Sequence, residues 1–564
     1  MRKLSFAVAI GVLALIVPLT AGAARRDGKI RTYEVLYAKG ASSDNGRAAI
    51  KKAGGRVTRE NRAIGVATVR SKNADFATEV ASSRAVYGAA HNRPVGYAPQ
   101  AQPRDPFAIE RSQDQRREQR GQGGQVARGS SKAGQEPLAS HQWDMRMIHA
   151  TPSGSYSHHD GRGRGVRVGV IDTGVDGSHP DIRGNFNRSL SRNFTVDDPI
   201  IDGPCADDPD GSCHDPNNVD EDGHGTHVAG TIASPINGRG IGGVAPDAEI
   251  VNLRAGQDSG FFFLQPSVDA LTYAANHGID VVNMSYYIDP WLYNCANNPA
   301  DTPAQQQEQR TIIAATERAL NYARSHGVTL VSALGNENTD IGHPTFDDTS
   351  PDYPPGNEHP RNVDNSCVDM PTEAPGVLGI SALGPSKRKA YYSNYGVEQT
   401  DLSAPGGDRR DFFGTPQYGA PDTRILAPYP KGVAEANGDL NPDGSPNNPL
   451  VLEDCSKGEC AYYQYLQGTS MASPHAVGVA AVVVGADGTR DRKNGGLEMS
   501  PRAVERVLTE TATKHACPSP RLYHYPDPDL DASYDARCEG SKRFNGFYGH
   551  GIVDALGAAR SARH

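Results

Sequence analysis

The stretch "VRVGVID", residues 166–172, opens a region in which short apolar segments alternate with amphipathic ones. A brief run rich in valine that ends in an aspartate predicts a buried strand. The same rhythm continues downstream, with helices at 225–234, 266–278 and 311–327 and strands at 249–255, 280–285 and 328–335. Strands that alternate with helices predict an α/β fold, in which helices cover both faces of a mostly parallel sheet.

Polar side chains of three kinds stand at the ends of these elements, where the active sites of such sheets gather. Asp172 ends the first strand, His224 begins the helix in "DGHGTHVAG" (222–230), and Ser470 enters a small-residue helix. An aspartate can orient an imidazole, which can take the proton of a serine hydroxyl and leave a nucleophile. At a helix N-terminus, backbone N–H groups would stabilise the negative charge that develops.

The histidines His224 and His227 also raise a metal-binding alternative, because they lie three residues apart behind the acidic run 220–222. Helices of zinc proteases place their histidines four residues apart with a glutamate between them, and this pair has neither feature. The spacing therefore favours proton transfer over metal binding.

The N-terminus of the 564-residue chain is typical of an exported protein. Arg2 and Lys3 precede an apolar stretch, 4–19, and small residues follow at 21–23, which predicts a signal peptide over residues 1–23. The alternative is an N-terminal membrane anchor, for which the apolar run is short. We expect a secreted protein, extracellular or periplasmic, without stable membrane association.

All eight cysteines lie beyond residue 200, and an even number in an exported chain predicts disulfides. Two pairs could close short loops, Cys205 with Cys213 and Cys455 with Cys460. Free buried thiols are the alternative, and the sequence leaves the remaining partners open.

Composition divides the chain into a basic front and an acidic back. Residues 1–135 hold 24 Lys and Arg against 10 Asp and Glu, whereas the remainder holds 33 against 56. Within the front, residues 30–98 predict a small α+β unit, and 99–137, rich in Gln, Arg, Gly and Ser, predict a disordered linker. Opposite charges favour docking of the front on the back. We expect no nucleic acid partner, because the chain is exported.

Three stretches resemble the signatures of subtilisin-like serine proteases, in that family's order Asp, His, Ser: "VIDTGVDGSHPD" (170–181), "DGHGTHVAG" (222–230) and "GTSMASPH" (468–475). The resemblance implies a subtilisin-like catalytic domain over 138–564, with Asp172, His224 and Ser470 as the catalytic residues. Asn336 of "ALGNE" (333–337) is implied as an oxyanion donor.

The resemblance further implies the activity, the substrates and the maturation of the protein. It implies an endopeptidase that cleaves protein or peptide substrates through an acyl-enzyme on Ser470, without a cofactor for the chemistry, and that acts as a monomer. Residues 30–98 resemble the family's prosegment, a ferredoxin-like domain that assists folding and then inhibits the enzyme until self-processing. The alternative is a catalytically silent binding protein on the same fold.

The substrate strand departs from the family pattern, which often reads Ser-Leu-Gly-Gly. The implied substrate-binding residues are Ser285, Tyr286, Tyr287, Ser332, Ala333, Leu334 and Gly335. A Tyr287 ring occupies space that glycine leaves open, so we expect small or basic residues before the cut rather than large aromatic ones. We expect the acidic insertion after Asn336 to be a solvated loop, with steering of cationic peptides as the alternative.

The family often holds a structural calcium, and two positions match it here. Asp181 lies in "SHPD" (178–181), and Asn237 lies in the loop "PINGRGIGG" (235–243). Oxygen ligands of this kind suit calcium rather than a transition metal. The resemblance therefore implies a calcium site at these two residues.

Overall fold

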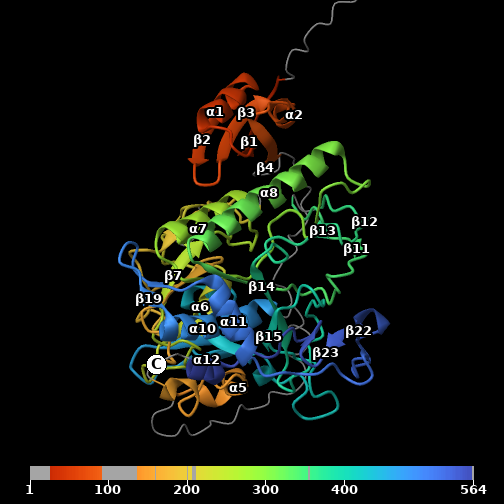
Figure 1. The fold of residues 1–564 in the computed structure, drawn as a ribbon. Helices are drawn as coiled ribbons and strands as arrows, with labels where there is room; N and C mark the ends of the chain where they lie inside the picture. The colour runs from red at the N-terminus through yellow and green to blue at the C-terminus, as the bar shows by residue number, and fades with distance from the viewer. Residues whose placement is uncertain are drawn as a thin grey trace, which may run out of the picture.

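The structure is a computed structural model that describes residues 26–91 and 136–561, except 159, 200, 206–210 and 354–355. The predicted signal peptide, residues 92–98 of the predicted prosegment and residues 99–135 of the predicted linker lie outside the described residues. The described chain forms a small N-terminal unit that lies on a much larger one (Figure 1).

The small unit is a four-stranded antiparallel sheet with two helices. Its elements are β1 (Arg26–Tyr37), α1 (Ser43–Lys52), β2 (Gly55–Asn61), β3 (Val66–Asn73), α2 (Phe76–Ala81) and β4 (Val86–His91). The strand order β2-β3-β1-β4 gives the ferredoxin-like arrangement that the resemblance implied. Tyr33 and Phe76, both fully buried, pack in its own core with tilted rings whose centroids are 4.8 Å apart. The local pattern did not predict β2 and β4, which carry few buried apolar residues or small ones.

The larger unit is built on a seven-stranded parallel sheet of order β15-β14-β10-β8-β5-β7-β6. Its strands are β5 (Arg167–Ile171), β6 (Arg192–Asn193), β7 (Glu249–Arg254), β8 (Val281–Met284), β10 (Thr329–Ala333), β14 (Val377–Leu383) and β15 (Leu402–Pro405). This confirms the predicted α/β class and its parallel sheet.

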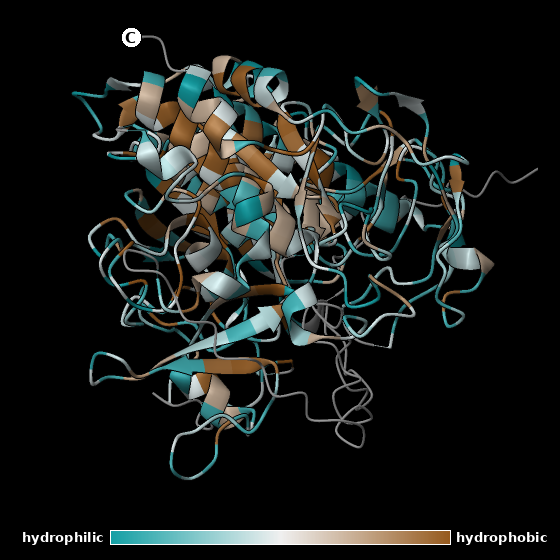
Figure 2. Cartoon of the chain, turned by 90° about the horizontal axis from the view of Figure 1, so that it is seen from below, coloured by the Kyte–Doolittle hydropathy of each residue, from teal (hydrophilic) through white to brown (hydrophobic). Residues whose placement is uncertain are grey.

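Helices cover both faces of this sheet, and β5 shows why. Successive side chains of a strand point to opposite faces, so Val168 and Val170 join one apolar core while Ile171 joins the other. The first core is covered by α6 (His224–Ala233), α10 (Thr469–Asp487), α11 (Pro501–Thr511) and α12 (Ala555–Ser561), and the second by α7 (Leu264–Asn276) and α8 (Pro303–Ser325). Figure 2 shows these apolar residues concentrated in the central helices and strands.

The central helix α10 is apolar enough, over its 19 residues, to meet the length and composition of a membrane span. Its most apolar window is 89% buried inside the protein. Its neighbours are the sheet and the helices α6, α11 and α12. The high hydropathy of α10 is therefore explained by its position as the core helix of the larger unit.

Short elements complete the larger unit around this core. The additional helices are α5 (Trp143–Met147) and α9 (Lys431–Ala436), with single 3-10 turns at Ala139–His141, Ser155–Ser157, Pro421–Thr423 and Ala532–Tyr534. A three-stranded antiparallel sheet consists of β16 (Ile425–Tyr429), β18 (Ala461–Leu466) and β17 (Val451–Asp454). Two-residue strands pair as β9 (Asn294–Cys295) with β13 (Cys367–Val368), β11 (Phe346–Asp347) with β12 (Arg361–Asn362), β19 (Thr489–Arg490) with β20 (Leu497–Glu498), β21 (Leu522–Tyr523) with β22 (Ala536–Arg537), and β23 (Gly540–Ser541) with β24 (Phe544–Asn545).

The chain enters the larger unit earlier than its composition suggested. Glu136, which we expected in the linker, is 4% exposed. Its carboxylate accepts hydrogen bonds from the backbone N–H groups of Gly238, at 3.1 Å, and Arg239, at 2.6 Å. The ordered part of the larger unit therefore includes residue 136.

The sheet of the small unit packs on α7 and α8, as Figure 1 shows. Leu36 and Ile64 belong to the same apolar cluster as Ile312 of α8. Arg318 of α8 donates to two backbone carbonyls of the small unit, Tyr37 O at 2.9 Å and Ile64 O at 3.2 Å. Apolar packing and these hydrogen bonds thus carry much of the described contact.

Charged side chains contribute to this docking through individual contacts rather than through a long-range electrostatic field. Arg59 pairs with Asp269 of α7 at 2.9 Å, and Asn61 donates to the same carboxylate at 2.7 Å. The backbone N–H of His91 donates to Glu308 of α8 at 3.0 Å. The signs agree with the predicted basic front and acidic back.

Candidate functional site

The first part of the site is a buried pair at the end of β5. His224 Nδ1 lies 2.7 Å from Asp172 Oδ1, with side-chain exposures of 1% and 0%. The same carboxylate oxygen accepts the backbone N–H of Thr173 at 2.8 Å. An aspartate held in this way fixes the orientation of the imidazole and leaves Nε2 as the basic nitrogen.

The acidic run before His224 shapes the start of α6. Asp220 accepts the backbone N–H of Gly223 at 2.9 Å and that of Thr226 at 2.9 Å, so it satisfies donors that the first helical turn leaves open. Gly223 has φ +99°, a conformation that favours glycine. A Cβ at Gly225 would meet the backbone oxygen of Gly174 at 2.0 Å. Both glycines thus allow His224 to approach the end of β5.

His227 has a structural place and forms no metal pair with His224. Its Nε2 lies 3.1 Å from Ile425 O and 3.0 Å from Gln464 O, between β16 and β18. Burial lowers the pKa of His227 to about 3, so the ring is neutral and donates to these carbonyls. His227 therefore joins α6 to β16 and β18 by hydrogen bonds.

Ser470 is the second residue of α10, at the helix N-terminus, and it is 3% exposed. The hydroxyl of Ser285, just beyond β8, donates to the backbone carbonyl of Ser470 at 3.2 Å. In the sheet, β8 lies between β5 and β10. Asp172, Ser285 and Asn336 follow the neighbouring strands β5, β8 and β10. Because parallel strands end at the same edge of a sheet, these residues lie together at that edge, next to the start of α10.

Asn336 is held with its amide in a defined direction. Its Oδ1 accepts the backbone N–H and the hydroxyl of Thr469, each at 2.9 Å. Because the amide oxygen faces Thr469, the amide nitrogen points the other way. A donor next to the first turn of α10 is placed to stabilise an oxyanion beside Ser470.

A pocket opens beside Ser470, and it brings together much of the predicted set. It is lined by Gly260, Phe262, Ser285, Tyr286, Tyr287, Asp289, Leu292, Ala333, Gly335, Asn336, Glu337, Asp369, Thr372, Thr469 and Ser470. Tyr286 stacks on Phe262 with centroids 4.2 Å apart, and the hydroxyl of Tyr287 donates to Asp352 at 2.5 Å. Both tyrosines are thus fixed as walls of the pocket.

Two predicted substrate-binding residues lie outside this lining. Ser332 is fully buried and donates to the backbone carbonyl of Met284 at 3.0 Å, which ties β10 to β8. Leu334 is fully buried in an apolar cluster with Leu292. Side chains alternate along a strand, so residues 332 and 334 face inward while Ala333 and Gly335 reach the pocket.

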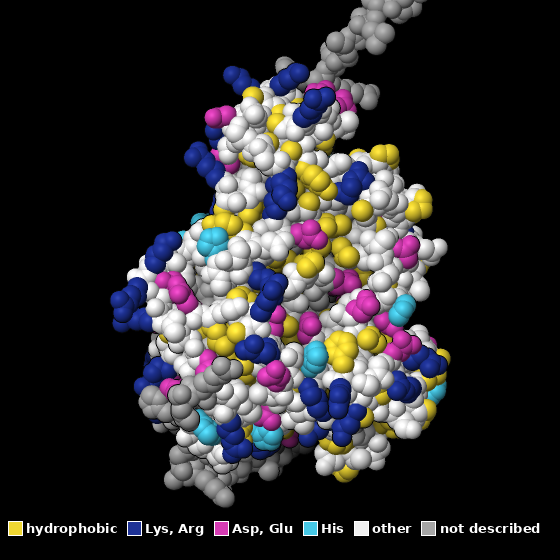
Figure 3. All heavy atoms as spheres, in the orientation of Figure 1, with side chains coloured by type: hydrophobic (Ala, Val, Ile, Leu, Met, Phe, Trp, Pro, Cys, Tyr) yellow, Lys and Arg dark blue, Asp and Glu magenta, His cyan; other side chains and the backbone are white. Residues whose placement is uncertain are grey.

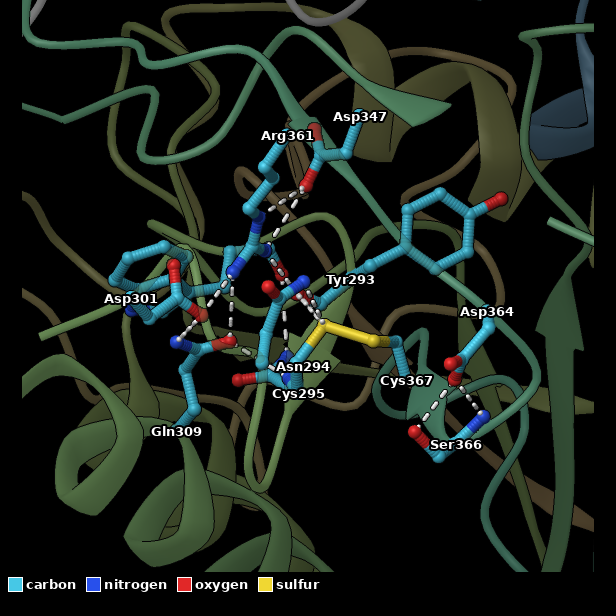
Figure 4. Close-up of a disulfide and its surroundings, with 12 residues drawn as sticks. Tyr293, Asn294, Cys295, Asp301, Gln309, Asp347, Arg361, Asp364, Ser366 and Cys367 are labelled. Atoms are coloured by element: carbon cyan, nitrogen blue, oxygen red, sulfur yellow. Dashed lines mark hydrogen bonds and ion pairs between the residues drawn. A yellow bond between two sulfur atoms is a disulfide. The ribbon is translucent and has the colours of Figure 1, made fainter. Parts of the chain in front are cut away.

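The acidic insertion after Asn336 is a folded wall, which corrects the expectation of a solvated loop for part of its length. The fully buried guanidinium of Arg361 pairs with Asp301 and Asp347 at 2.5 and 3.0 Å (Figure 4). Its charge also lies over the ring of Trp291, 4.7 Å from the centroid. Asp347 of the insertion therefore turns inward, to a buried cation, rather than to solvent.

A disulfide anchors the end of this wall. Cys295, in β9, is bonded to Cys367, in β13, across a sequence separation of 72 (Figure 4). The other pairs are Cys205–Cys213, Cys455–Cys460 and Cys517–Cys538, so all eight cysteines are bonded and both predicted short loops are confirmed.

The pocket also contains carboxylates that the sequence reasoning missed. Asp289 and Asp369 are 5% and 3% exposed, and both line the pocket. Asp289 could have been noticed two residues after Tyr287. Asp369 could not, because the Cys295–Cys367 disulfide and the pairing of β9 with β13 bring it to the pocket from a distant part of the chain.

Asp181 and Asn237 do lie together. Asn237 Nδ2 donates to Asp181 Oδ1 at 3.0 Å, while Ile241 N and the Tyr463 hydroxyl donate to Oδ2 at 3.1 and 3.2 Å. Asn237 Oδ1 is buried without a hydrogen-bond partner among the described residues. Burial raises the pKa of Asp181 to about 8.

These features test whether the pair fits calcium. A cation would satisfy the orphaned oxygen of Asn237 and favour ionised Asp181, and both residues offer the oxygen ligands that calcium takes. The ammonium of Lys457 donates to the backbone carbonyl of Asn237, so one positive charge is already close by. The pair offers calcium two oxygen ligands once the Asn237 amide, whose nitrogen faces Asp181, turns its oxygen towards the cation.

The fold and the site define a class: an α/β protein with an Asp–His pair and a serine at a helix N-terminus, the arrangement of serine hydrolases. A family model described as the subtilase family, peptidase S8, matches residues 163–551. The chain therefore belongs to the subtilase family.

Individual relatives agree with this assignment. The chain is 28% identical over 355 residues to fervidolysin of Fervidobacterium pennivorans. This match covers 62% of this chain and 38% of the relative. It is 25% identical over 352 residues to subtilisin DY of Bacillus licheniformis, covering 62% of this chain and 85% of the relative. The chain thus spans well under half the length of fervidolysin.

A solved structure shows the fold over nearly the whole chain. The epidermin leader peptide processing serine protease of Staphylococcus aureus matches with a TM-score of 0.60 and 21% identity, covering 95% of this chain and 99% of that one. At this identity the likeness concerns the fold alone.

Proposed function

We propose that this protein is a secreted serine endopeptidase that hydrolyses peptide bonds through an acyl-enzyme on Ser470. The observation that carries the proposal is the buried pair of His224 and Asp172, 2.7 Å apart, at the sheet edge where Ser470 begins α10. Family membership supports the same chemistry.

In this mechanism, His224 Nε2 takes the proton of the Ser470 hydroxyl as the oxygen attacks the scissile carbonyl. Asp172 holds Nδ1–H and stabilises the imidazolium that forms. The protonated ring then gives its proton to the leaving amine, and the acyl-enzyme remains. A water, deprotonated by the same nitrogen, attacks the ester, and the proton returns to Ser470 as the acid product leaves.

The oxyanion of each tetrahedral intermediate would be stabilised by two donors. One is the backbone N–H of Ser470, at the positive end of α10. The other is the side-chain amide of Asn336, which Thr469 holds in place through the amide oxygen. No cofactor takes part in these steps.

The small unit acts, in this proposal, as an inhibitory prosegment of a self-processed zymogen that works as a monomer. Its docking on α7 and α8 supports the proposal. The small unit ends with β4 at His91, whose backbone N–H donates to Glu308 of α8, so the unit is held on the larger one up to its last described residue. The predicted signal peptide supports secretion. Proteins and peptides are the proposed substrates, and the prosegment is the proposed inhibitor.

Labelling with a serine-directed fluorophosphonate tests the chemistry. The processed protein should be labelled at Ser470, whereas Ser470→Ala should not be labelled and His224→Ala should react far more slowly. Ser473→Ala is a matched control, because Ser473 lies in the same helix and bonds to Ser285. A folded wild-type protein that resists labelling would support the silent binding protein instead.

Maturation gives a second test. Purified Ser470→Ala should persist as a chain that retains its small unit, whereas the wild type should shorten at a rate independent of protein concentration if processing is intramolecular. Normal processing of Ser470→Ala in the absence of other proteases would contradict self-cleavage.

A further inference from the structure

The pocket beside Ser470 is strongly acidic. Three carboxylates line it, Asp289, Glu337 and Asp369, and none of the described residues in its lining is a lysine, arginine or histidine. Figure 3 shows acidic side chains gathered on the middle of the face that lies below the small unit. A binding pocket of one charge sign selects for ligands of the other.

Two of the three carboxylates already have donors. Asp289 accepts the backbone N–H of Phe262. Glu337 accepts the backbone N–H of Asn336 at 2.9 Å and the amide of Asn394 at 2.6 Å. These contacts hold both groups in the walls and partly satisfy their charge.

Asp369 is different, because one of its oxygens has no partner. Asp369 is only 3% exposed, and its Oδ1 has no hydrogen bond among the described residues. A buried carboxylate oxygen without a donor costs free energy unless a ligand supplies one. Burial and the neighbouring Glu373 raise the pKa of Asp369 well above its usual range, as expected of a carboxyl that lacks a cation.

The fold holds Asp369 firmly at this place. It follows β13, which pairs with β9 and is bonded to it through Cys367. The backbone N–H of Asp369 donates to Glu373 at 2.8 Å, and Thr372 lies 2.9 Å from Ser332 of β10. A side chain anchored on both sides is suited to recognition, because little ordering is left for the ligand to induce.

We propose that the pocket binds the cationic side chain, lysine or arginine, of the residue before the scissile bond, and that Asp369 is the residue that determines this specificity. This inference rests on the proposed peptidase function and names its substrate class. The incoming ammonium or guanidinium donates to Asp369 Oδ1, which is thereby satisfied.

The same geometry disfavours other side chains. A neutral side chain of equal size leaves Asp369 buried and unpaired, and an anionic one meets three carboxylates. A large aromatic ring meets the walls of Tyr286 and Tyr287, which are fixed by Phe262 and Asp352. The tyrosines thus exclude bulk, and the carboxylate selects charge.

Cleavage of matched peptides that differ only before the cut tests the proposal with the processed enzyme. The peptides carry arginine, lysine, citrulline, which is the uncharged isostere of arginine, or phenylalanine. A charged hydrogen bond of this kind predicts that kcat/KM for arginine exceeds that for citrulline about 10- to 100-fold. Salt at 0.15 M screens long-range steering, so that the ratio reports the pocket.

Asp369→Asn should bring this ratio close to one by slowing the arginine peptide and leaving the citrulline peptide nearly unchanged. Asp364→Asn is the matched control, because Asp364 lies just before β13, is exposed and lies outside the pocket lining. It should keep the wild-type ratio. An unchanged ratio in Asp369→Asn, or wild-type preference for phenylalanine, would overturn the proposal.

Two further readouts distinguish a failure of the specificity proposal from a failure of the proposed peptidase function. Fluorophosphonate labelling of each preparation reports the nucleophile independently of the pocket, so a labelled wild-type enzyme with an arginine-to-citrulline ratio near one would overturn only the specificity. An unlabelled wild type would overturn the proposed function itself. If Asp369→Asn is not labelled, the wild type decides: benzamidine should compete with substrate and uncharged benzamide should not, and equal competition would refute the cationic pocket.

Discussion

Removal of the Cys295–Cys367 disulfide is the perturbation whose effect can be worked furthest from the structure. The bond spans a sequence separation of 72 and closes a loop that contains α8 and β10. Cys455–Cys460 offers a matched comparison, because it spans only 5 residues at an exposed turn. Both can be replaced by alanine pairs in a Ser470→Ala background, in which autolysis is suppressed.

Loop length sets the expected magnitudes. In the chain-entropy description, a cross-link stabilises by restricting the unfolded chain, by about 4.4 kcal/mol for a separation of 72 and about 2.1 kcal/mol for a separation of 5. Loss of two buried sulfurs adds to the larger value, since Cys295 and Cys367 are 1% and 3% exposed. Removing Cys517–Cys538, with a separation of 21, should fall between them at about 3.3 kcal/mol.

Calorimetry at a fixed scan rate measures the outcome. For a unit of this size, 1 kcal/mol corresponds to about 1 °C in Tm, so Cys295→Ala/Cys367→Ala should melt about 5 °C lower and the short-loop variant about 2 °C lower. Equal shifts, or a larger shift for Cys455→Ala/Cys460→Ala, would refute the loop-length reasoning. In the active enzyme the long-loop variant should also lose preference for arginine while Ser470 is still labelled, because Asp369 loses its anchor.

The remaining predictions concern the site and its cation. Asn336→Ala should lower kcat about 10²- to 10³-fold, a magnitude measured for this donor in subtilisin itself, with a smaller change in KM; an unchanged kcat would remove Asn336 from the mechanism. Calcium bound by Asp181 and Asn237 would stabilise the folded state, so chelation should lower Tm and speed autolysis; superimposed melting curves would show that the pair holds no calcium. The arginine-to-citrulline ratio should rise with pH, because Asp369 attracts a cation only when ionised and its pKa is raised by burial beside Glu373. The ratio is therefore low below this raised pKa and grows as the pH passes through it; a ratio that falls with rising pH between 5 and 8 would contradict this sign.

The sheet and its edge could be predicted because their signals are local. The alternation of apolar residues in 166–171 places Val168 and Val170 on one face and Ile171 on the other, and this period needs no knowledge of distant residues. Asp172, at the end of this strand, was predicted for the same reason, whereas Asn336 was predicted from the resemblance to the subtilase family. Where the local signal was weak, as in β2 and β4 of the small unit, the strands were missed.

Tertiary structure alone decided how the pocket is lined. Asp289 and Asp369 are 80 residues apart in the chain, and they share a pocket because a disulfide and a two-strand pairing join their segments. The acidic insertion looked solvated by composition, since acids are usually exposed. Arg361 reverses that expectation for Asp347, because a paired charge can be buried where an unpaired one cannot.

The sequence by itself thus determined the fold class and the residues that stand at the sheet edge, whose positions follow from short-range periodicity and helix termini. The tertiary structure decided which distant carboxylates meet, which of them are satisfied, and which one, Asp369, is left to a ligand. The physical reason is that burial and pairing are properties of three-dimensional neighbours, and the chain order of those neighbours carries no local signal.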